Sequence, residues 1–311
     1  MAWELNMKIL VVGAGAIGGY FGGRLLEAGR DVTFLVRPER AARLAETGLV
    51  ISSGCGDVTL PAPPTIQAGA VRDPFDLVLV SCKAYDLEGA IAAFAPAVGP
   101  NSVILPVLNG MRHLDRLGQQ FRHLLGGLVL ISSGLDPDGR ILHFNTMQGL
   151  VYGERDGSRS GRVEAIAAEF AAARFDARLS VQILQDMWEK WIFIASMAGI
   201  NCLMRGAAAD LMAADGAGFA LALLDECAAI AAHNGFPPSA ASLDRTRSIL
   251  TDPGSTITAS MLKDLERSAP IEADQVIGDL LRRGDQRPGA HPLLRLVLAH
   301  LKTYEARRAR G

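Results

Sequence analysis

Residues 8–40, "KILVVGAGAIGGYFGGRLLEAGRDVTFLVRPER", give the clearest indication of how the N-terminal part of this chain folds. It consists of an apolar strand, a glycine-rich turn, an amphipathic helix and a second apolar strand. Its glycines have the spacing G-x-G-x-x-G, at Gly13, Gly15 and Gly18. In this pattern the first glycine allows a tight turn, the second lets a pyrophosphate approach the backbone, and the third lets the helix pack closely on the strand. The stretch therefore predicts a dinucleotide-binding βαβ unit, with the pyrophosphate at the helix N-terminus.

The residues between these glycines, Ala14, Ala16 and Ile17, belong to the same turn, and we expect the whole turn to bind the cofactor. The alternative is a glycine turn that serves helix packing only. The further glycines Gly19, Gly22 and Gly23 extend the small-residue face of the helix, and we assign those to packing.

The end of the second strand predicts which nucleotide is bound. An NAD-selective site places an acidic residue about 20 positions beyond the glycines, where it accepts hydrogen bonds from the ribose. This chain has Arg37 there, whereas Asp31 lies at the other end of the strand and Glu39 follows a proline. A guanidinium favours a 2′-phosphate, so we expect NADP(H). The alternative is a solvated arginine at a strand end.

The rest of the chain predicts an α/β fold, in two domains. Apolar runs at residues 8–12, 31–36, 76–81, 102–107 and 127–132 suit a mostly parallel sheet buried on both faces, with helices such as 18–28 and 38–47 packed on it. Residues 139–154 resemble a hairpin. From about residue 181 the strand runs give way to Ala/Leu-rich helical segments, in which Asp215 can cap a helix that ends near Gly235. We therefore expect a Rossmann-type dinucleotide-binding domain over 1–180 and an all-α substrate domain over 181–311.

Two polar residues follow later strands of the predicted sheet. They are Lys83 in "VSCKAYD" and Asn109 in "PVLNGM". Open α/β sheets bind ligands at the carboxyl ends of their strands, so both are candidate site residues. For Asn109, which precedes a glycine, a simple turn is the competing interpretation.

A lysine lies at the start of an apolar helical run in "DMWEKWIFIASMAGINCLMRG", residues 186–206. Lys190 is flanked by Trp188 and Trp191, and residues 191–204 carry no charge. A run that short predicts a buried core helix, because a membrane span needs about 20 apolar residues. Lys190 is therefore either a snorkelling surface residue or a charge retained for chemistry.

Composition limits the classes of partner. The chain has 311 residues, of which 49% are apolar and 21% charged, with a net charge of −2, so nothing suggests a nucleic acid or an anionic membrane as partner. The four cysteines form no CxxC pair, which favours reduced thiols over disulfides or a metal site. The N-terminus carries Glu4 and does not resemble a signal peptide, so we expect a cytoplasmic protein.

Several motifs occur together in one order along nearly the whole chain. They are the GAGAIG turn, the arginine after the second strand, the lysine of "CKAYD", the asparagine of "LNGM", the lysine of "WEK", and the late segment "SMLKDLERSAPIEADQVIG". In this the chain resembles the ketopantoate reductase (2-dehydropantoate 2-reductase) family. The resemblance implies a helical domain like the C-terminal one of 6-phosphogluconate dehydrogenase, and reduction of a 2-oxo acid by NADPH on the route to pantothenate. It assigns the general acid to Lys190, the acidic partner to Glu272, a substrate contact to Ser260, and cofactor contacts to Arg37, Lys83 and Asn109.

Elementary chemistry agrees with a lysine in that role. Hydride addition to a ketone leaves negative charge on oxygen, which requires a proton donor within hydrogen-bond reach. Partial burial lowers the pKa of Lys190, and a carboxylate such as Glu272 limits that fall. For Glu272 the alternative is an acidic residue in a first helical turn after Pro270.

The chain departs from the family on the helix that follows Lys190. Asparagines that the family commonly has one and two turns further along, and a third later one, are Ile194, Ala198 and Ala208 here. Spacing of four keeps Lys190, Ile194 and Ala198 on one helix face, so we expect Ile194 and Ala198 to contact the substrate in a more apolar pocket. Asn201 lies on roughly the same face and could compensate in part.

Three functions stay open at this point. The first is an NADPH-dependent reductase of ketopantoate, which also contacts Asn109. The second is a related reductase of a more apolar 2-oxo acid or imine, and the third is a non-catalytic NADP(H)-binding sensor. A sensor needs no proton donor, so Lys190, Ser260 and Glu272 argue against the third. The apolar helical domain could support a homodimer.

Overall fold

The computed structural model describes residues 7–310, and these form two compact units. Unit 1 comprises residues 7–108 and 113–184, and unit 2 comprises residues 109–112 and 185–310. The domain limits of 1–180 and 181–311 stay a prediction, to which the structure adds that the short segment 109–112 groups with the helical unit. Residues 1–6, on which the expectation of no signal peptide rests, lie outside the described residues.

The first sheet of unit 1 is wholly parallel and confirms the predicted fold class. Its strand order is β5-β2-β1-β6-β7, and every neighbouring pair is parallel. Four of the five predicted apolar runs correspond to its strands, because strands covered on both faces need continuous apolar sequence. The strands are β1 (Ile9–Val12), β2 (Val32–Leu35), β5 (Thr65–Ile66), β6 (Phe75–Val80) and β7 (Val98–Pro106).

The helices of unit 1 begin and end where local chemistry requires. Helix α2 starts at Pro38, which suits a first helical position because proline lacks an N–H, and stops at Gly48, which has φ +73°. The uncharged run after residue 88 contains three prolines and divides into α3, the short helix η2 and strand β7. The helices are α1 (Gly18–Glu27), α2 (Pro38–Thr47), α3 (Leu87–Phe94), α4 (Arg112–Gly118) and α5 (Gly161–Phe170), with 3₁₀ turns η1 (Ala84–Asp86) and η2 (Ala95–Ala97).

A second, mixed sheet corrects two expectations. The apolar run at 127–132 belongs to β8 (Gly126–Leu135), which pairs antiparallel with β9 (Ile141–Gly153) rather than joining the parallel sheet. Residues 139–154 are therefore one long strand and not a hairpin. The turn-like "NTMQ" forms a bulge there, because Ser133 pairs with His143 whereas Ile131 pairs with Gln148. The order is β10-β9-β3-β4, with β3 (Leu49–Ser53), β4 (Val58–Leu60) and β10 (Asp176–Leu179).

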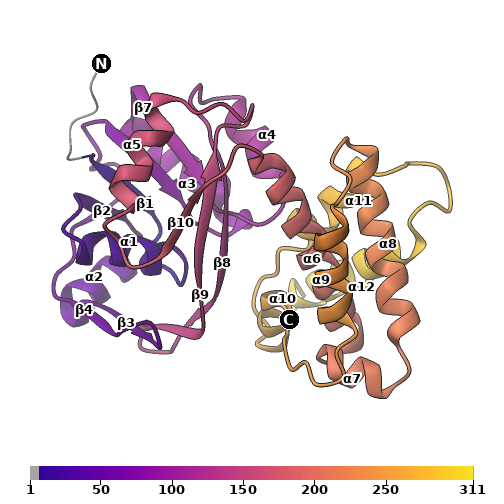
Figure 1. The fold of residues 1–311 in the computed structure, drawn as a ribbon. Helices are drawn as coiled ribbons and strands as arrows, with labels where there is room; N and C mark the ends of the chain where they lie inside the picture. The colour runs from indigo at the N-terminus through magenta and orange to yellow at the C-terminus, as the bar shows by residue number, and fades with distance from the viewer. Residues whose placement is uncertain (1–6, 311) are drawn as a thin grey trace. The chain divides into compact units, whose positions relative to one another are not determined.

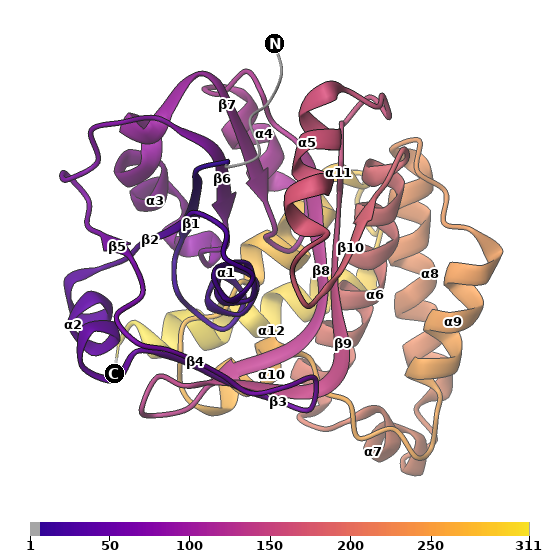
Figure 2. The same cartoon turned by 60° about the vertical axis from the view of Figure 1, so that its left-hand side comes forward.

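Helix α1 packs on both sheets through its glycines. A Cβ on Gly22 would lie 2.7 Å from Phe34 of the first sheet, and a Cβ on Gly19 would lie 2.6 Å from Ile141 of the second. Figure 2 views α1 nearly end-on, with β1 and β2 on one side and β3, β4 and β9 on the other. These close approaches support the assignment of the extra glycines to packing.

Unit 2 is built from helices in the described residues (Figure 1). Helix α8 ends as predicted, with Gly235 at φ +85°, but Asp215 does not cap it: Gly216 is the N-cap residue, and Asp215 has the left-handed φ of +57°. The helices are α6 (Ile183–Met204), α7 (Ala208–Ala213), α8 (Ala217–His233), α9 (Ala240–Leu250), α10 (Ser260–Glu266), the π-helical turn η3 (Asp274–Gly278), α11 (Asp279–Arg283) and α12 (Pro292–Arg308).

The tryptophans beside Lys190 are core anchors of unit 2. Trp188 and Trp191 are each at most 2% exposed, their rings lie 4.9 Å apart, and Trp188 stacks on Phe236. The indole N–H of Trp191 donates to the backbone oxygen of Val276 in η3 at 2.9 Å. These contacts fix the rotation of α6 and therefore the direction in which Lys190 leaves it. In the described part of the chain, no helix has the length and apolarity needed to cross a membrane.

Candidate active site

The glycine turn of unit 1 has the geometry that a bound pyrophosphate requires. Gly13 has φ +94°, a conformation that favours glycine. A Cβ on Gly15 would meet nothing within 4 Å, so the backbone is open on that side. A Cβ on Gly18 would lie 2.1 Å from both the Gly13 oxygen and Ser81 Oγ, which explains why only glycine fits there. Helix α1 follows at once, and its N-cap residue, Ile17, makes no side-chain cap to its first amides. The turn therefore fits a dinucleotide pyrophosphate.

Arg37 lies at the end of β2, and its side chain forms an ion pair that the sequence did not predict. Its Nη2 donates to Asp86 Oδ1 at 2.6 Å, with the side chains 77% and 34% exposed. Asp86 belongs to η1, in the loop after β6. The Asp86 carboxylate raises the pKa of the Arg37 guanidinium through this hydrogen bond. An exposed pair of this kind contributes only about 0–1 kcal/mol, so a stronger ligand can displace it.

A second arginine, Arg40, contacts the glycine turn directly. Its Nε donates to the Ala14 oxygen at 3.0 Å, and its Nη1 donates to the Gly139 oxygen at 2.9 Å. Burial lowers the pKa of this guanidinium. Arg40 lies three residues after Arg37, in the first turn of α2, and its closeness in sequence to Arg37 was the signal that could have identified it.

The structure places Lys83 in unit 1 and Asn109 in unit 2. Lys83 is the third residue after β6 and is partly buried, at the N-terminus of η1. Asn109 belongs to the segment 109–112 that groups with the helical unit. The cofactor contacts expected of both residues stay predictions.

Unit 2 contains a cavity of about 110 Å³ that gathers most of the other predicted site residues. Three of its predicted polar residues are Asn109, Ser260 and Glu272, and the predicted apolar ones are Ile194 and Ala198. The sequence did not predict the remaining lining residues, which come from α6, from residues 257–264 and from η3: Phe193, Met197, Ile257, Thr258, Ala259, Met261, Asp264 and Val276.

Lys190 is bound to one wall of this cavity through Asn109. Its Nζ donates to Asn109 Oδ1 at 3.0 Å, across 81 positions of sequence. Burial lowers the pKa of Lys190 to about 8, against the opposing effect of the negative charge of Glu272. A snorkelling lysine would keep its ammonium in solvent and its usual pKa, so this geometry favours the interpretation as a retained charge.

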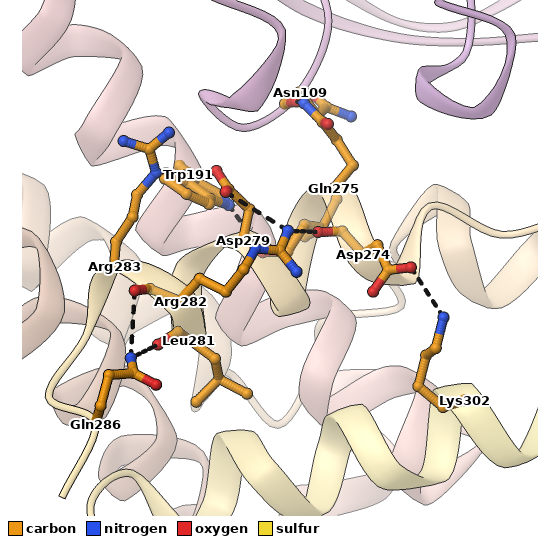
Figure 3. A network of polar contacts seen from close by, with 11 residues as sticks. Asn109, Trp191, Asp274, Gln275, Asp279, Leu281, Arg282, Arg283, Gln286 and Lys302 are labelled. Atoms are coloured by element: carbon orange, nitrogen blue, oxygen red, sulfur yellow. Dashed lines mark hydrogen bonds and ion pairs between the residues drawn. The ribbon is translucent and has the colours of Figure 1, made fainter. Parts of the chain in front are cut away.

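Asn109 is itself held by the segment that follows Glu272. The Gln275 side chain donates from Nε2 to the Asn109 backbone oxygen at 2.7 Å. Gly110 has φ +75°, and a Cβ there would lie 2.7 Å from the Gln275 oxygen, so the turn needs glycine to approach this closely. Figure 3 shows Gln275 reaching Asn109 while Trp191 lies nearby. Asn-Gly therefore forms a turn and also presents an amide to Lys190, so the two interpretations are compatible.

The π-helical turn η3 arranges these groups. It begins at Asp274, two residues after Glu272, and its widened backbone supplies both the Gln275 side chain and the Val276 oxygen that accepts from Trp191. Single π turns inside helical segments are frequent at functional sites. Lys302 of α12 supports the turn from outside, through an ion pair with Asp274 at 2.9 Å (Figure 3).

The opposite wall is apolar, and Asn201 does not replace the missing amides. Its Nδ2 donates to the Gly206 oxygen at 2.8 Å, and its Oδ1 accepts from the Ala259 N–H at 2.7 Å, so both ends are used by backbone. Asn201 is buried and does not line the cavity; it anchors the residue before Ser260. Ala208 is buried at the start of α7 and does not line the cavity either.

Comparison with known proteins identifies the family. The family model described as "Ketopantoate reductase PanE/ApbA" matches residues 9–157, and its C-terminal companion matches residues 182–305. An uncharacterized oxidoreductase, YkpB of Bacillus subtilis (strain 168), is 39% identical over 96% of this chain and 99% of its own.

Solved structures share the fold across nearly the whole chain. A crystal structure of 2-dehydropantoate 2-reductase from Geobacter metallireducens GS-15 has a TM-score of 0.87 at 27% identity and covers 96% of this chain and 99% of its own. A D-mandelate dehydrogenase with NADH and anilino(oxo)acetate also has a TM-score of 0.87, at 21% identity, covering 97% and 100% of the two chains; it shows the fold alone. Together with the family models, these matches show that the chain belongs to the ketopantoate reductase family of oxidoreductases.

Proposed function

We propose that this protein uses NADPH to reduce a 2-oxo acid to the 2-hydroxy acid, with Lys190 as the proton donor. The observation that carries the proposal is the 3.0 Å hydrogen bond from the Lys190 ammonium to Asn109, a residue that lines a mainly apolar cavity. The negative charge of Glu272, which also lines this cavity, acts on the same ammonium. An ammonium in such surroundings has little structural purpose, because burying a charge costs free energy that an apolar side chain would avoid.

The chemistry assigns a separate task to each residue. The glycine turn and Arg37 would hold the dinucleotide, whose reduced nicotinamide would supply the hydride that adds to the carbonyl carbon. Lys190 donates a proton from Nζ to the carbonyl oxygen, and Asn109 Oδ1 orients that ammonium. With a pKa of about 8, Lys190 is protonated in about nine molecules of ten at pH 7, yet it releases its proton far more readily than a solvated lysine. Glu272 keeps the pKa from falling further.

Arg37 supports NADPH rather than NADH as the donor, and it yields a direct test. Replacing Arg37 with Ala removes a charge-assisted contact to the 2′-phosphate, worth about 1.5–3 kcal/mol, so NADPH should bind about ten to one hundred times more weakly. NADH should change little, as measured by titration calorimetry. Equal losses for both nucleotides would contradict Arg37 as the group that recognises the phosphate.

Two kinds of 2-oxo acid are candidate substrates, and a different observation supports each. 2-Dehydropantoate follows from family membership, and Ser260, Thr258 and Asn109 line the cavity with polar groups. A 2-oxo acid with a larger apolar side chain follows from the wall formed by Ile194 and Ala198, since Asn201 is engaged elsewhere. Apolar contact there contributes about 0.8 kcal/mol per buried CH₂ group.

A panel of 2-oxo acids, assayed by loss of NADPH absorbance, tests the proposal. We expect turnover of at least one member, with kcat/KM for 2-dehydropantoate compared against branched and aromatic 2-oxo acids. Lys190→Met should lower kcat about 10²–10⁴-fold on every member that the wild type reduces. Binding of NADPH without turnover of any member would instead favour a non-catalytic sensor.

A further inference from the structure

The acidic residue missing from the end of β2 is supplied by a different segment. The second strand ends in Arg37, but the Asp86 carboxylate of η1 lies 2.6 Å from its Nη2. Asp86 is 49 positions away in sequence, and no dinucleotide motif would identify it. One site therefore contains the cation that favours a 2′-phosphate and the type of group that accepts from ribose hydroxyls.

We propose that Asp86 is a specificity-determining residue that sets the choice between NADPH and NADH through its ion pair with Arg37. The inference rests on the proposed nicotinamide cofactor. With NADPH, the 2′-phosphate must displace Asp86 from Arg37 before it can bind the guanidinium, and this competition weakens NADPH binding. NADH has no 2′-phosphate, so the ion pair between Arg37 and Asp86 stays intact when NADH binds. Asp86 therefore makes the preference for NADPH over NADH smaller than Arg37 alone would make it.

The exposure of the pair is what makes the exchange possible. The Arg37 side chain is 77% exposed, so it can turn from Asp86 to a phosphate without breaking core contacts. Asp86 precedes α3 at its N-cap, but its side chain makes no cap hydrogen bond, so the residue has no helix-capping task that would explain it. Its carboxylate accepts a hydrogen bond from the Arg37 guanidinium.

The charged side chains near the Arg37–Asp86 pair are bound to other groups. Arg40 lies one helical turn further on, but its Nε and Nη1 are committed to the backbone oxygens of Ala14 and Gly139. Glu88 lies two residues beyond Asp86, and its carboxylate is bound by Arg116 at 2.8 Å. Removing the charge of either Arg37 or Asp86 should therefore change the affinity for a nucleotide that carries a 2′-phosphate.

The test is the ratio of NADH to NADPH dissociation constants, measured by titration calorimetry at fixed ionic strength on the intact chain. Asp86→Asn keeps the shape of the side chain and removes its charge. We expect this ratio to rise about five- to tenfold, with tighter NADPH binding and weaker or equal NADH binding. Glu88→Gln is the matched control, because it removes the same charge two residues away, and it should leave the ratio within twofold.

A second variant separates the ion pair from a general change of charge. In an Arg37→Ala background, Asp86→Asn should change the ratio by less than twofold, because the group that Asp86 restrains is absent. A ratio that stays constant or falls in Asp86→Asn, or an equal response in both backgrounds, would overturn the inference. Wild-type protein that binds neither nucleotide would overturn the proposed function together with this inference, whereas NADPH binding with an unaltered ratio would overturn the inference alone.

Discussion

The glycine turn of unit 1 and the cavity of unit 2 are built in different ways. The turn uses backbone geometry: Gly13 supplies a positive φ, Gly15 an open face, and Gly18 a contact too close for any side chain. The cavity uses a few side chains from distant segments, among which Lys190, Asn109 and Gln275 form one chain of hydrogen bonds. Substitutions in the turn should therefore act through shape, and substitutions around the cavity through charge and polarity.

The largest effect should come from Lys190, and it should separate activity from stability. Lys190→Met is expected to lower kcat about 10²–10⁴-fold, because a positioned acid contributes that much, while NADPH binding stays near wild type. The folded-state pKa of about 8 lies below the usual 10.5, so the folded protein binds fewer protons between those values. The buried ammonium therefore destabilises the fold below pH 8, and this cost disappears as pH rises towards 10.5.

The same variant should consequently be more stable at pH 7. A shift of this size corresponds to about 3 kcal/mol, and because Lys190 is only partly buried by surface area we expect a gain of about 1–2 kcal/mol in the free energy of unfolding. Lys8→Met is the control, since Lys8 is exposed and belongs to unit 1; it should leave both stability and kcat near wild type. If the Lys190→Met protein kept a kcat within a few-fold of wild type, this would favour the interpretation of Lys190 as a snorkelling surface residue.

Two glycines of the turn should differ in how much stability is lost when each is replaced by alanine. Gly18→Ala places a Cβ 2.1 Å from the Gly13 oxygen, so we expect a loss of about 1–3 kcal/mol in stability, with loss of nucleotide binding. Gly15→Ala meets nothing within 4 Å, so thermal unfolding should stay constant while NADPH affinity falls about tenfold, because the methyl group occupies the space of the pyrophosphate. Equal stability of the two variants, measured by calorimetry, would show that the turn does not act through shape.

The smallest expected effect concerns the apolar wall of the cavity. The double variant Ile194→Asn with Ala198→Asn adds two amides to the helix face of Lys190. We expect kcat/KM to rise by up to about tenfold for 2-dehydropantoate and to fall for 2-oxo acids without a hydroxyl, because unpaired polar groups in a closed site cost about 1–3 kcal/mol each. Joint loss for both substrates, with unfolding temperature followed as a control, would mean that this wall is structural.

The sequence predicted those features that depend on local chemistry. Helices α1 and α2 and four strands of the parallel sheet follow from continuous apolar runs, Pro38 and the glycines, which act within a few residues. Strand β9 was missed because its "NTMQ" segment resembles a turn, and only the pairing with β8 turns it into a bulge. That pairing depends on long-range register, which local pattern does not encode.

The sequence predicted those candidate site residues that can be recognised one at a time from their residue type and position. Lys190 stood out as a charge at the start of an apolar run, and the family resemblance indicated Glu272, Ser260 and Asn109. The contacts between residues were not predictable. Asp86 pairs with Arg37, and both ends of the Asn201 amide bind backbone, because the fold brings segments together that the sequence separates.

The role of Lys190 as the proton donor can be tested by the pH dependence of kcat/KM for the 2-oxo acid, measured at saturating NADPH. If Lys190 donates the proton, kcat/KM should be level near neutral pH and fall about tenfold per unit above pH 8, because kcat/KM reports the ionisation of the acid before substrate binds. Glu272→Gln should move this fall to lower pH, since the Glu272 charge raises the pKa of Lys190. A profile that stays level from pH 7 to about pH 10, in both proteins, would contradict Lys190 as the proton donor.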